Sequence, residues 1–262
     1  MSLRKLSIVV PTYNEKDNIY SLVELVDEAL RGIPYEIIFV DDSTDSTPEI
    51  LKDISEKDGR VRFEHRIGEK GLSTAVMRGF ELADGDYIAV MDADLQHPPA
   101  VLRSMYCAMG NHADMCIPSR FIKGGSDGGL DPVRKLVSAT ARYIGKIVLP
   151  CLRHVSDPTG GLFMFRKDIM RDADMRPIGW KILIEVLATC RYDKIIEIPY
   201  EFSRRNAGQS KLSGRVTLEY LKQVAMLVPR AGQNNTTVIR WTPERMAERV
   251  AGMDEYIAKN NR

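Results

Sequence analysis

Two aspartates separated by one residue are the clearest chemical signal in this 262-residue chain. Asp92 and Asp94 follow an apolar run at 87–91, and Gln96 comes two residues later. Hard divalent cations such as Mg²⁺ and Mn²⁺ choose oxygen ligands of this kind. A lone Asp-x-Asp pair can equally be a solvated turn, so the spacing alone leaves both interpretations open.

Two further polar clusters also come directly after apolar runs. The first covers residues 11–15 (PTYNE), and the second covers residues 41–47 (DDSTDST). In an open parallel sheet, ligands bind outside the carboxyl ends of the strands. We therefore expect these clusters and the Asp92–Asp94 pair to converge on one edge of a sheet, which favours a metal site over a solvated turn.

The elements that must position these clusters alternate between strand and helix. Buried strands are predicted from apolar runs at 6–11, 36–40 and 87–91, and a weaker strand is predicted at 61–66. Helices are predicted from apolar or helix-favouring spacing at 18–30, 47–57 and 71–83. Strands that are apolar on both faces and alternate with helices predict an α/β fold, in which helices flank a mostly parallel sheet.

The second half of the chain is less regular. Further strands are predicted at 115–118, 162–165 and 194–202. Further helices are predicted at 133–149, 180–190 and 216–227. From Pro229 the chain becomes polar, and then one helical stretch follows at 243–259. We therefore predict a catalytic domain over 1–228 and a polar helical tail over 229–262.

The charge of the chain is balanced overall but uneven locally. Its 37 basic and 36 acidic residues give a net charge of +1, which argues against a nucleic-acid partner. Seven Arg or Lys residues lie within 120–154 against two acids, and four lie within 203–215 with no acid. Two such segments suit a phosphate-rich ligand, although a pair of solvated basic faces is the alternative.

Several classes of protein are excluded or disfavoured. Neither a G-x-G-x-x-G motif nor a P-loop follows the predicted strands, which disfavours dinucleotide cofactors and P-loop ATPases. The four scattered cysteines suggest reduced thiols rather than disulfides or a zinc site. The sequence has neither a signal peptide nor a run of about 20 apolar residues. We therefore expect a cytoplasmic protein that is not secreted.

Longer strings of residues carry a family resemblance. In the first half these strings are VVPTYNE, FVDDSTDST, GEKGLSTAVMRGF and MDADLQHPP. In the second half they are SRF, DPTGG and the F-x-x-R-x-x-G-x-S-K spacing that runs from Phe202 to Lys211. Over about residues 5–228 the chain resembles family 2 glycosyltransferases of the GT-A fold, and within them the dolichol-phosphate mannose synthases and related polyprenyl-phosphate glycosyltransferases.

The resemblance implies a role for individual residues. Those implied to bind the nucleotide are Pro11, Tyr13, Glu15, Val40, Asp42, Asp92, Ala93 and Asp94. Those implied to hold Mg²⁺ or Mn²⁺ and the donor diphosphate are Asp92, Asp94 and Gln96. Those implied to act in catalysis, two of them by neutralising phosphates, are Asp94, Arg205 and Lys211. Those implied to bind the acceptor phosphate are Arg120, Arg134 and Ser138.

The resemblance also implies an activity, namely inverting transfer of mannose from GDP-mannose to dolichyl or polyprenyl phosphate. A phosphate oxygen is already anionic near pH 7 and needs no general base, whereas a sugar hydroxyl does. Glu185 is a candidate base for a hydroxyl acceptor, although its place within 180–190 favours a structural role. The alternatives are transfer from UDP-glucose, a soluble acceptor, or a catalytically silent nucleotide-binding module.

A polyprenyl phosphate acceptor requires access to a membrane. The predicted helix at 133–149 has an apolar stripe with basic residues mostly off it. Such a helix can lie at the surface of a bilayer, or it can pack its stripe on the core, and the sequence leaves both open. We expect a peripheral protein at the cytoplasmic membrane face, recruited directly or through a membrane partner subunit.

Overall fold

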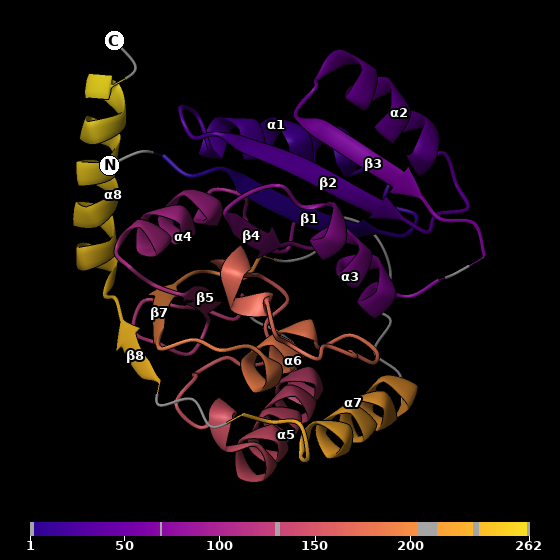
Figure 1. Ribbon diagram of the computed structural model, residues 1–262, viewed down its shortest axis with the longest axis vertical. Coiled ribbons are helices and arrows are strands. Elements are labelled where there is room, and N and C mark those ends of the chain that lie inside the picture. Colours follow the sequence, from indigo (N-terminus) through magenta and orange to yellow (C-terminus); the bar gives the residue numbers. More distant parts are fainter. Residues whose placement is uncertain (1–2, 69, 129–131, 204–213, 233–235, 261–262) are drawn as a thin grey trace.

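The computed structural model describes residues 3–68, 70–128, 132–203, 214–232 and 236–260, without the side chains of 132–138, 141 and 214–217 (Figure 1). Its strands form one eight-stranded sheet in the order β3-β2-β1-β4-β6-β5-β7-β8. The strands are β1 (Leu6–Thr12), β2 (Tyr35–Asp41), β3 (Val61–His65), β4 (Tyr87–Val90), β5 (Met115–Ser119), β6 (Phe163–Arg166), β7 (Lys194–Pro199) and β8 (Thr237–Arg240). Among them only β6 runs antiparallel to its neighbours, which confirms the predicted mostly parallel sheet.

Helices cover both faces of this sheet. They are α1 (Ile19–Ala29), α2 (Thr47–Lys57), α3 (Leu72–Leu82), α4 (Val101–Gly110), α5 (Pro132–Val148), α6 (Ile182–Thr189), α7 (Gly214–Leu227) and α8 (Pro243–Asn260). Alternate residues of β1 serve different faces: Ile8 packs with the α1 and α4 side of the core, and Val9 with the α3 and α6 side. Because both faces are buried, the strand reads as a continuous apolar run.

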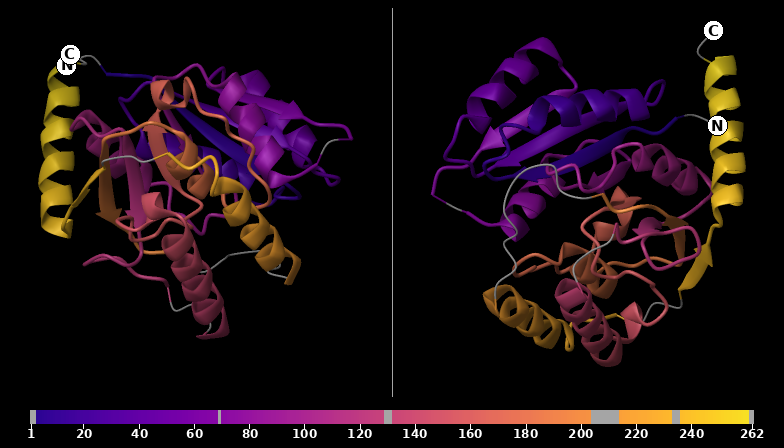
Figure 2. Two further views of the ribbon diagram at one scale, coloured as in Figure 1. Left: turned by 60° about the horizontal axis from the view of Figure 1, so that its bottom comes forward. Right: turned by 180° about the vertical axis from the view of Figure 1, so that it is seen from behind.

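Two helices lie side by side at one end of the molecule. Figures 1 and 2 show α5 and α7 together, away from α1 and α2, and the buried ring of Tyr220 on α7 reaches Gly145 on α5. A Cβ on Gly145 would lie 2.4 Å from the Tyr220 hydroxyl oxygen. Glycine at this position therefore permits the close packing of the two helices.

The structure adds two elements that the sequence analysis did not predict. Helix α4 has buried residues around most of its circumference, including Leu102, Tyr106 and Met109, so it lacks the polar face that marks a helix in a sequence. Strand β8 is four residues long and pairs in parallel with β7 at the sheet edge. Short edge strands give little periodicity from which to predict them.

The C-terminal segment packs on the rest of the molecule. Helix α8 confirms the helix predicted at 243–259, and it lies against α4 (Figure 1). Trp241 and Ile257 are buried in the core cluster that β1 and α4 also share. Arg103 on α4 donates a hydrogen bond to Asp254 on α8, with 2.8 Å between Nε and Oδ1. These contacts attach the segment to the sheet, and the domain limit at 228 stays a prediction.

Candidate active site

The strand order brings the predicted site loops to one edge of the sheet. The carboxyl ends of β1, β2, β4, β5 and β7 point the same way, because these strands are parallel in direction. Strand β6 runs the other way, and its first residue, Phe163, pairs with Val90 at the end of β4. The loop that precedes β6 therefore lies at the same edge as the loops that follow β4 and β5.

The loops after β1 and β2 are tied to each other. Asn14 adopts a left-handed conformation with φ of 59°, and its N–H donates to Ser43 Oγ at 2.7 Å. The Thr44 N–H donates in turn to Asn14 Oδ1 at 2.8 Å. The Glu15 N–H donates to Thr47 Oγ1 at 3.1 Å. These bonds confirm that the first two polar clusters converge, and they fix the backbone around Tyr13 and Glu15.

Asp42 at the end of β2 is engaged by an arginine. Its carboxylate accepts from Arg66 twice, at 2.8 Å (Nε to Oδ1) and 2.6 Å (Nη2 to Oδ2), and from the Gly71 N–H at 2.9 Å. Both side chains of the pair are buried. The ion pair anchors the loop that leads from β3 into α3. Any nucleoside contact with Asp42 would therefore meet a carboxylate whose charge is already balanced by Arg66.

The other residues implied to bind the nucleotide fall into two groups. The side chains of Pro11, Val40 and Ala93 are buried at or next to the strand ends. Tyr13 has an exposed ring, and Lys70 Nζ lies 5.9 Å from its centroid. An exposed ring beside a cation can stack against a base. The three buried side chains lie beneath the surface at the carboxyl ends of the strands.

Asp92 and Asp94 lie in a tight turn after β4. Leu95 has φ of 59°, and Asp94 Oδ1 accepts from the Gln96 N–H at 3.1 Å. The Asp94 side chain is buried, while that of Asp92 is partly exposed. A Cβ on Gly161 would lie 2.8 Å from Asp92 Oδ2. A side chain at position 161 would therefore push into the Asp92 carboxylate.

This donor set fits a cation that shares its coordination with a phosphate ligand. Among the residues that the structure describes, no group of three or more His, Cys, Asp or Glu forms a complete metal cage. Mg²⁺ is usually held by one or two carboxylates together with substrate phosphates and water. Asp92 and Asp94 supply two such carboxylates. The third residue implied to hold the cation, Gln96, has its side-chain nitrogen 3.5 Å from the Ser203 carbonyl oxygen.

Positive charge lies beside this acidic turn. Arg120, which follows β5, forms a two-point ion pair with Asp157 at 2.8 Å (Nε to Oδ2) and 3.1 Å (Nη2 to Oδ1). Lys181 is partly buried, and its Nζ donates to the Thr159 carbonyl oxygen at 2.9 Å. Burial, and then the neighbouring Arg120, lower the pKa of Lys181, while Asp157 and Asp92 oppose that shift. This edge of the sheet therefore has an acidic part, Asp92 and Asp94, and a basic part, Arg120 and Lys181, that interact electrostatically.

No functional role was predicted from the sequence for Lys181 or Asp157. Asp157 was part of the DPTGG string, but its pairing with Arg120 spans 37 residues. Lys181 comes just before α6, whose residues are mostly apolar and buried. A lysine at the start of an apolar helix could have indicated a paired lysine, because lysine is rarely buried unless it has a partner.

The ring of His97 is buried at this edge of the sheet. It stacks on Tyr200 with 5.7 Å between ring centroids, and it meets the edge of Phe202 at 5.2 Å. Its Nε2 lies 3.9 Å from Asp92 Oδ2. Burial lowers the pKa of His97 to about 4, although Asp94 acts in the opposite direction. His97 is therefore neutral near pH 7 and supports Asp92 by packing rather than by charge.

The remaining predicted residues have no described side chains. Arg134 and Ser138 lie on α5, but their side chains fall outside the described part of the structure. Arg205 and Lys211 lie outside the described residues altogether. Their roles stay predictions from the sequence resemblance.

Glu185 is enclosed in the core instead of facing the edge. Its Oε1 accepts from the Arg176 N–H at 2.7 Å and pairs with Arg230 Nη1 at 2.9 Å. Its Oε2 accepts from Gln223 Nε2 at 3.2 Å. These contacts join α6 to α7 and to the segment before α6, which supports the structural role expected from the sequence.

Replacing Glu185 with glutamine is expected to reduce stability without altering the pH dependence of catalysis. The change leaves Arg230 without its buried counter-charge, which costs about 3 kcal/mol of unfolding free energy. Denaturant unfolding measures that loss, and kcat between pH 5.5 and 9 shows whether a titrating base has been removed. A lost limb of the pH profile at unchanged stability would instead make Glu185 a general base.

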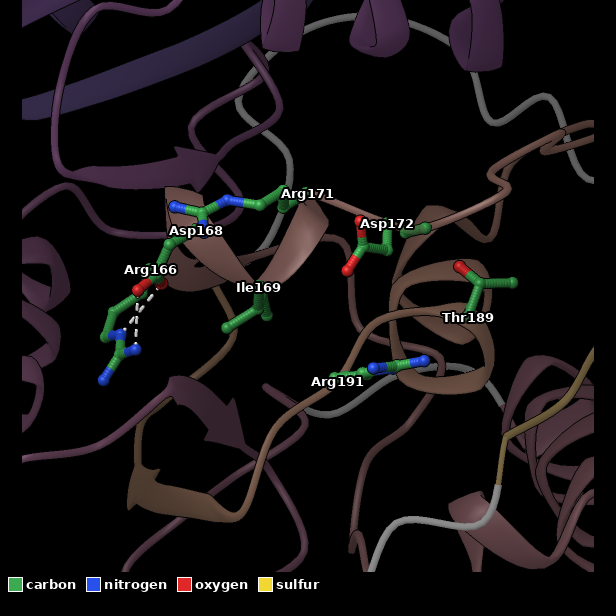
Figure 3. Close-up of a pocket in the computed structure, with 8 residues that line it drawn as sticks. Arg166, Asp168, Ile169, Arg171, Asp172, Thr189 and Arg191 are labelled. Carbon is green, nitrogen blue, oxygen red and sulfur yellow. Dashed lines mark hydrogen bonds and ion pairs between the residues drawn. The ribbon is translucent and has the colours of Figure 1, made fainter.

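A separate polar cavity of about 200 Å³ lies elsewhere (Figure 3). Arg166, Asp168 and Arg191 line it, and Arg166 pairs with Asp168 at 2.7 Å. Arg166 is the last residue of β6 and pairs with Tyr87 at the start of β4. The cavity is therefore at the opposite edge of the sheet from Asp92, and it does not belong to the candidate active site.

A family model described as glycosyl transferase family 2 matches residues 7–173. The match runs from β1 to the segment after β6 and includes Asp92, Asp94, Arg120 and Asp157. The chain belongs to glycosyl transferase family 2. This finding confirms the family inferred from the sequence strings. The acidic turn, Arg120 and Asp157 fall inside the matched region, and Lys181 follows it.

Three curated relatives of this family 2 glycosyltransferase are named dolichol-phosphate mannosyltransferase. The protein of that name from Pyrococcus furiosus is 44% identical over 230 residues, which cover 87% of this chain and 65% of that protein. The one from Saccharomyces cerevisiae is 36% identical, with 87% and 89% covered. The one from Mycosarcoma maydis is 34% identical, with 84% and 78% covered. The chain thus spans slightly less than two thirds of the Pyrococcus relative.

Solved structures share the fold at low sequence identity. Glucosyl-3-phosphoglycerate synthase from Mycobacterium tuberculosis, in complex with Mn²⁺, UDP and glucosyl-3-phosphoglycerate, has a TM-score of 0.63 at 19% identity, with 87% of this chain and 80% of that chain covered. The same enzyme with Mg²⁺ and UDP has a TM-score of 0.62 at 21% identity, with the same coverage. These likenesses confirm the fold class of the family 2 glycosyltransferase.

Proposed function

We propose that this family 2 glycosyltransferase transfers mannose from GDP-mannose to dolichyl or polyprenyl phosphate, with inversion at the sugar. One observation carries the proposal: the Asp92–Asp94 turn lies beside two partly buried cations, Arg120 and Lys181, at one sheet edge. Transfer between two phosphate-bearing substrates needs both a cation site and fixed positive charge. The name shared by the three curated relatives supports the choice of donor and acceptor.

At the donor end, Asp92 and Asp94 are the residues that would hold Mg²⁺ or Mn²⁺. When bound, such a cation offsets the negative charge that develops on the departing nucleoside diphosphate. Tyr13 supplies an exposed ring for the base, and Gly161 leaves room at the Asp92 carboxylate. Arg205 and Lys211 are proposed to add positive charge around the same diphosphate.

At the acceptor end, Arg120 is proposed to bind the lipid phosphate together with Arg134 and Ser138, and Lys181 lies within electrostatic range of Arg120. A phosphate oxygen attacks as an anion, so the reaction needs no general base. The enclosed position of Glu185 agrees with such a mechanism. Attack from the face opposite the leaving group inverts the anomeric centre.

The acceptor also implies contact with a membrane, and α5 and α7 are the helices proposed to make it. Their exposed apolar side chains include Tyr143 and Ile147 on α5 and Leu218 and Leu221 on α7. Apolar side chains gathered on two neighbouring helices are typical of a membrane-surface contact. No helix in the described residues is both long and apolar enough to cross a bilayer. We propose contact at the cytoplasmic face, directly or with a membrane partner subunit.

Charged substitutions on these helices are expected to weaken binding to lipid vesicles. Ile147 and Leu218 are each 73% exposed, so Ile147→Glu and Leu218→Glu should leave the fold intact. Loss of one inserted aliphatic side chain should weaken vesicle binding by roughly tenfold. Vesicle co-sedimentation measures the effect. Ile67→Glu is the matched control, because Ile67 is 93% exposed but lies in the loop after β3. Equal binding by all three variants would contradict the assignment.

Labelled GDP-mannose, a divalent cation and a short polyprenyl phosphate test the proposal, with UDP-glucose in parallel and extraction of the lipid phase as readout. We expect cation-dependent label in the lipid from GDP-mannose. Label from UDP-glucose alone would keep the mechanism but replace the donor. An absence of lipid label from either donor, despite measurable nucleotide binding, would overturn the proposal in favour of a soluble acceptor or a catalytically silent module.

A further inference from the structure

A second cavity, of about 470 Å³, lies beside the candidate active site. Its walls come from the start of the loop after β5, from α5 and from the link between β8 and α8. Aromatic and cationic side chains dominate the lining, among them Phe121, Lys123, Arg142, Lys146, Arg240 and Trp241. Cations next to aromatic walls in one cavity indicate a ligand that carries negative charge.

Phe121 connects this cavity with the edge described above. Its ring centroid lies 5.2 Å from the Arg120 guanidinium carbon and 3.8 Å from that of Arg142. Arg120 is held by Asp157, whereas Arg142 lines the cavity. The cavity therefore adjoins the candidate active site, and its lining includes neither Arg120 nor the acidic turn.

The described acids around the cavity balance only part of its positive charge. Glu197 pairs with Arg240 at 2.9 Å, and its other oxygen accepts from Ser156 Oγ and N–H, each at 2.6 Å. Glu244 lies within electrostatic range of Lys123. Burial, and then Arg142, lower the pKa of Lys146, and Arg240 adds to this shift while Glu197 opposes it. The cations therefore repel one another across the cavity.

Arg142 also has an unmet hydrogen bond. Its Nη1 is buried and has no hydrogen-bond partner among the residues that the structure describes. A buried donor without a partner destabilises the folded state unless a ligand or water accepts from it. An anion in the cavity would accept from this nitrogen and reduce the repulsion between Arg142 and Lys146.

We propose that this cavity is a binding site for an anionic phosphate group, distinct from the donor and acceptor positions of the candidate active site. The phosphate oxygens accept from Arg142 Nη1 and from Lys146, and the rings of Phe121 and Trp241 enclose the remainder of the ligand. The volume exceeds what one phosphate needs, so the site admits a lipid headgroup as well as free phosphate. The inference does not depend on which sugar the enzyme transfers.

Trp241 gives a local reporter for this site. The chain has two tryptophans, so Trp180→Phe leaves Trp241 as the sole one. Titration of that protein with inorganic phosphate should give a saturable change in tryptophan fluorescence. Adding Arg142→Gln and Lys146→Gln should weaken binding by at least about tenfold, because two charge-assisted contacts are lost. Lys146→Gln alone should weaken it by about fourfold and tests the site independently of the Arg142–Phe121 packing.

The matched control carries Arg31→Gln and Lys52→Gln, which remove the same charge at exposed positions near α1 and on α2. Vesicles of phosphatidylcholine, with and without phosphatidic acid, separate the two sources of phosphate. A response to phosphatidic acid beyond that to phosphatidylcholine assigns a lipid headgroup, and a response to inorganic phosphate alone assigns a free phosphate. The proposal is overturned if neither probe gives a saturable change, or if both cavity variants bind as tightly as the control.

Discussion

Replacing Asp94 with asparagine is expected to lower kcat/KM for sugar transfer by at least about 10³-fold. The buried Asp94 carboxylate is one of two acidic groups in the turn after β4. Asparagine keeps the oxygen that accepts from the Gln96 N–H at 3.1 Å, so the turn should persist. The change removes the negative charge that would hold a divalent cation against the donor diphosphate. Initial rates of label transfer into the lipid phase measure the loss.

Asp168→Asn is the matched control for this experiment. Asp168 is half exposed and lies near the opposite edge of the sheet, where it pairs with Arg166 (Figure 3). Because an exposed ion pair contributes at most about 1 kcal/mol, the control should keep near wild-type rates. If Asp94→Asn retained transfer within threefold of wild type at saturating cation, the assignment of Asp94 to the cation site would be wrong.

Asp157→Asn is expected to lower both stability and affinity for the acceptor. Asp157 is fully buried and balances Arg120, so its loss leaves an arginine without a counter-charge in the protein interior. Breaking a buried pair in this way costs about 3–5 kcal/mol, which corresponds to a decrease in Tm of roughly 10 °C. Arg120 should also leave its present orientation, and KM for polyprenyl phosphate should rise more than kcat falls. Thermal unfolding and acceptor titrations measure the two effects.

Asp254→Asn provides a comparison in a more exposed setting. Asp254 pairs with Arg103, but its side chain is 45% exposed. Its removal should cost less than about 1 kcal/mol and leave the acceptor KM unchanged. If Asp157→Asn behaved like Asp254→Asn in both measurements, Asp157 would not be needed to position Arg120. The proposal that the Arg120–Asp157 pair orients Arg120 toward the acceptor phosphate would then be wrong.

The sequence predicted the sheet well because its strands are buried on both faces. A run such as IVV at 8–10 has no polar alternation, and both core clusters take residues from it. Helix α4 was missed for a related reason, since residues buried around most of a helix give no amphipathic pattern. Strand β8 was missed because four residues at a sheet edge carry little signal.

The convergence of the polar clusters at one sheet edge could be predicted, whereas the contacts of each side chain could not. Strand ends could be located from the sequence, so the convergence of the polar clusters followed from the topology rule for parallel sheets. Partners far apart in the chain could not be found this way. Arg66 balances Asp42 across 24 residues, and Asp157 balances Arg120 across 37. No periodicity or local spacing encodes which arginine meets which carboxylate.

Resemblance to a family also does not predict how deeply each site residue's side chain is buried. Val40 and Ala93 were expected at the nucleotide, and their side chains are buried in the core. No role was predicted for Lys181 or His97, yet His97 is buried and Lys181 partly buried next to the acidic turn. The surroundings of each group, rather than its type, set its charge: His97 is neutral, with its pKa lowered to about 4.

The central claim is that the nucleophile is a phosphate oxygen held at the Arg120 side of the edge. Polyprenyl phosphate and the polyprenol of equal length, compared under GDP-mannose and a divalent cation, test it most directly. The structure has an enclosed Glu185 and partly buried cations beside Asp92, so we predict transfer to the phosphate and none above background to the alcohol. Comparable transfer to polyprenol, or to a soluble sugar, would contradict the claim and require a general base at this edge.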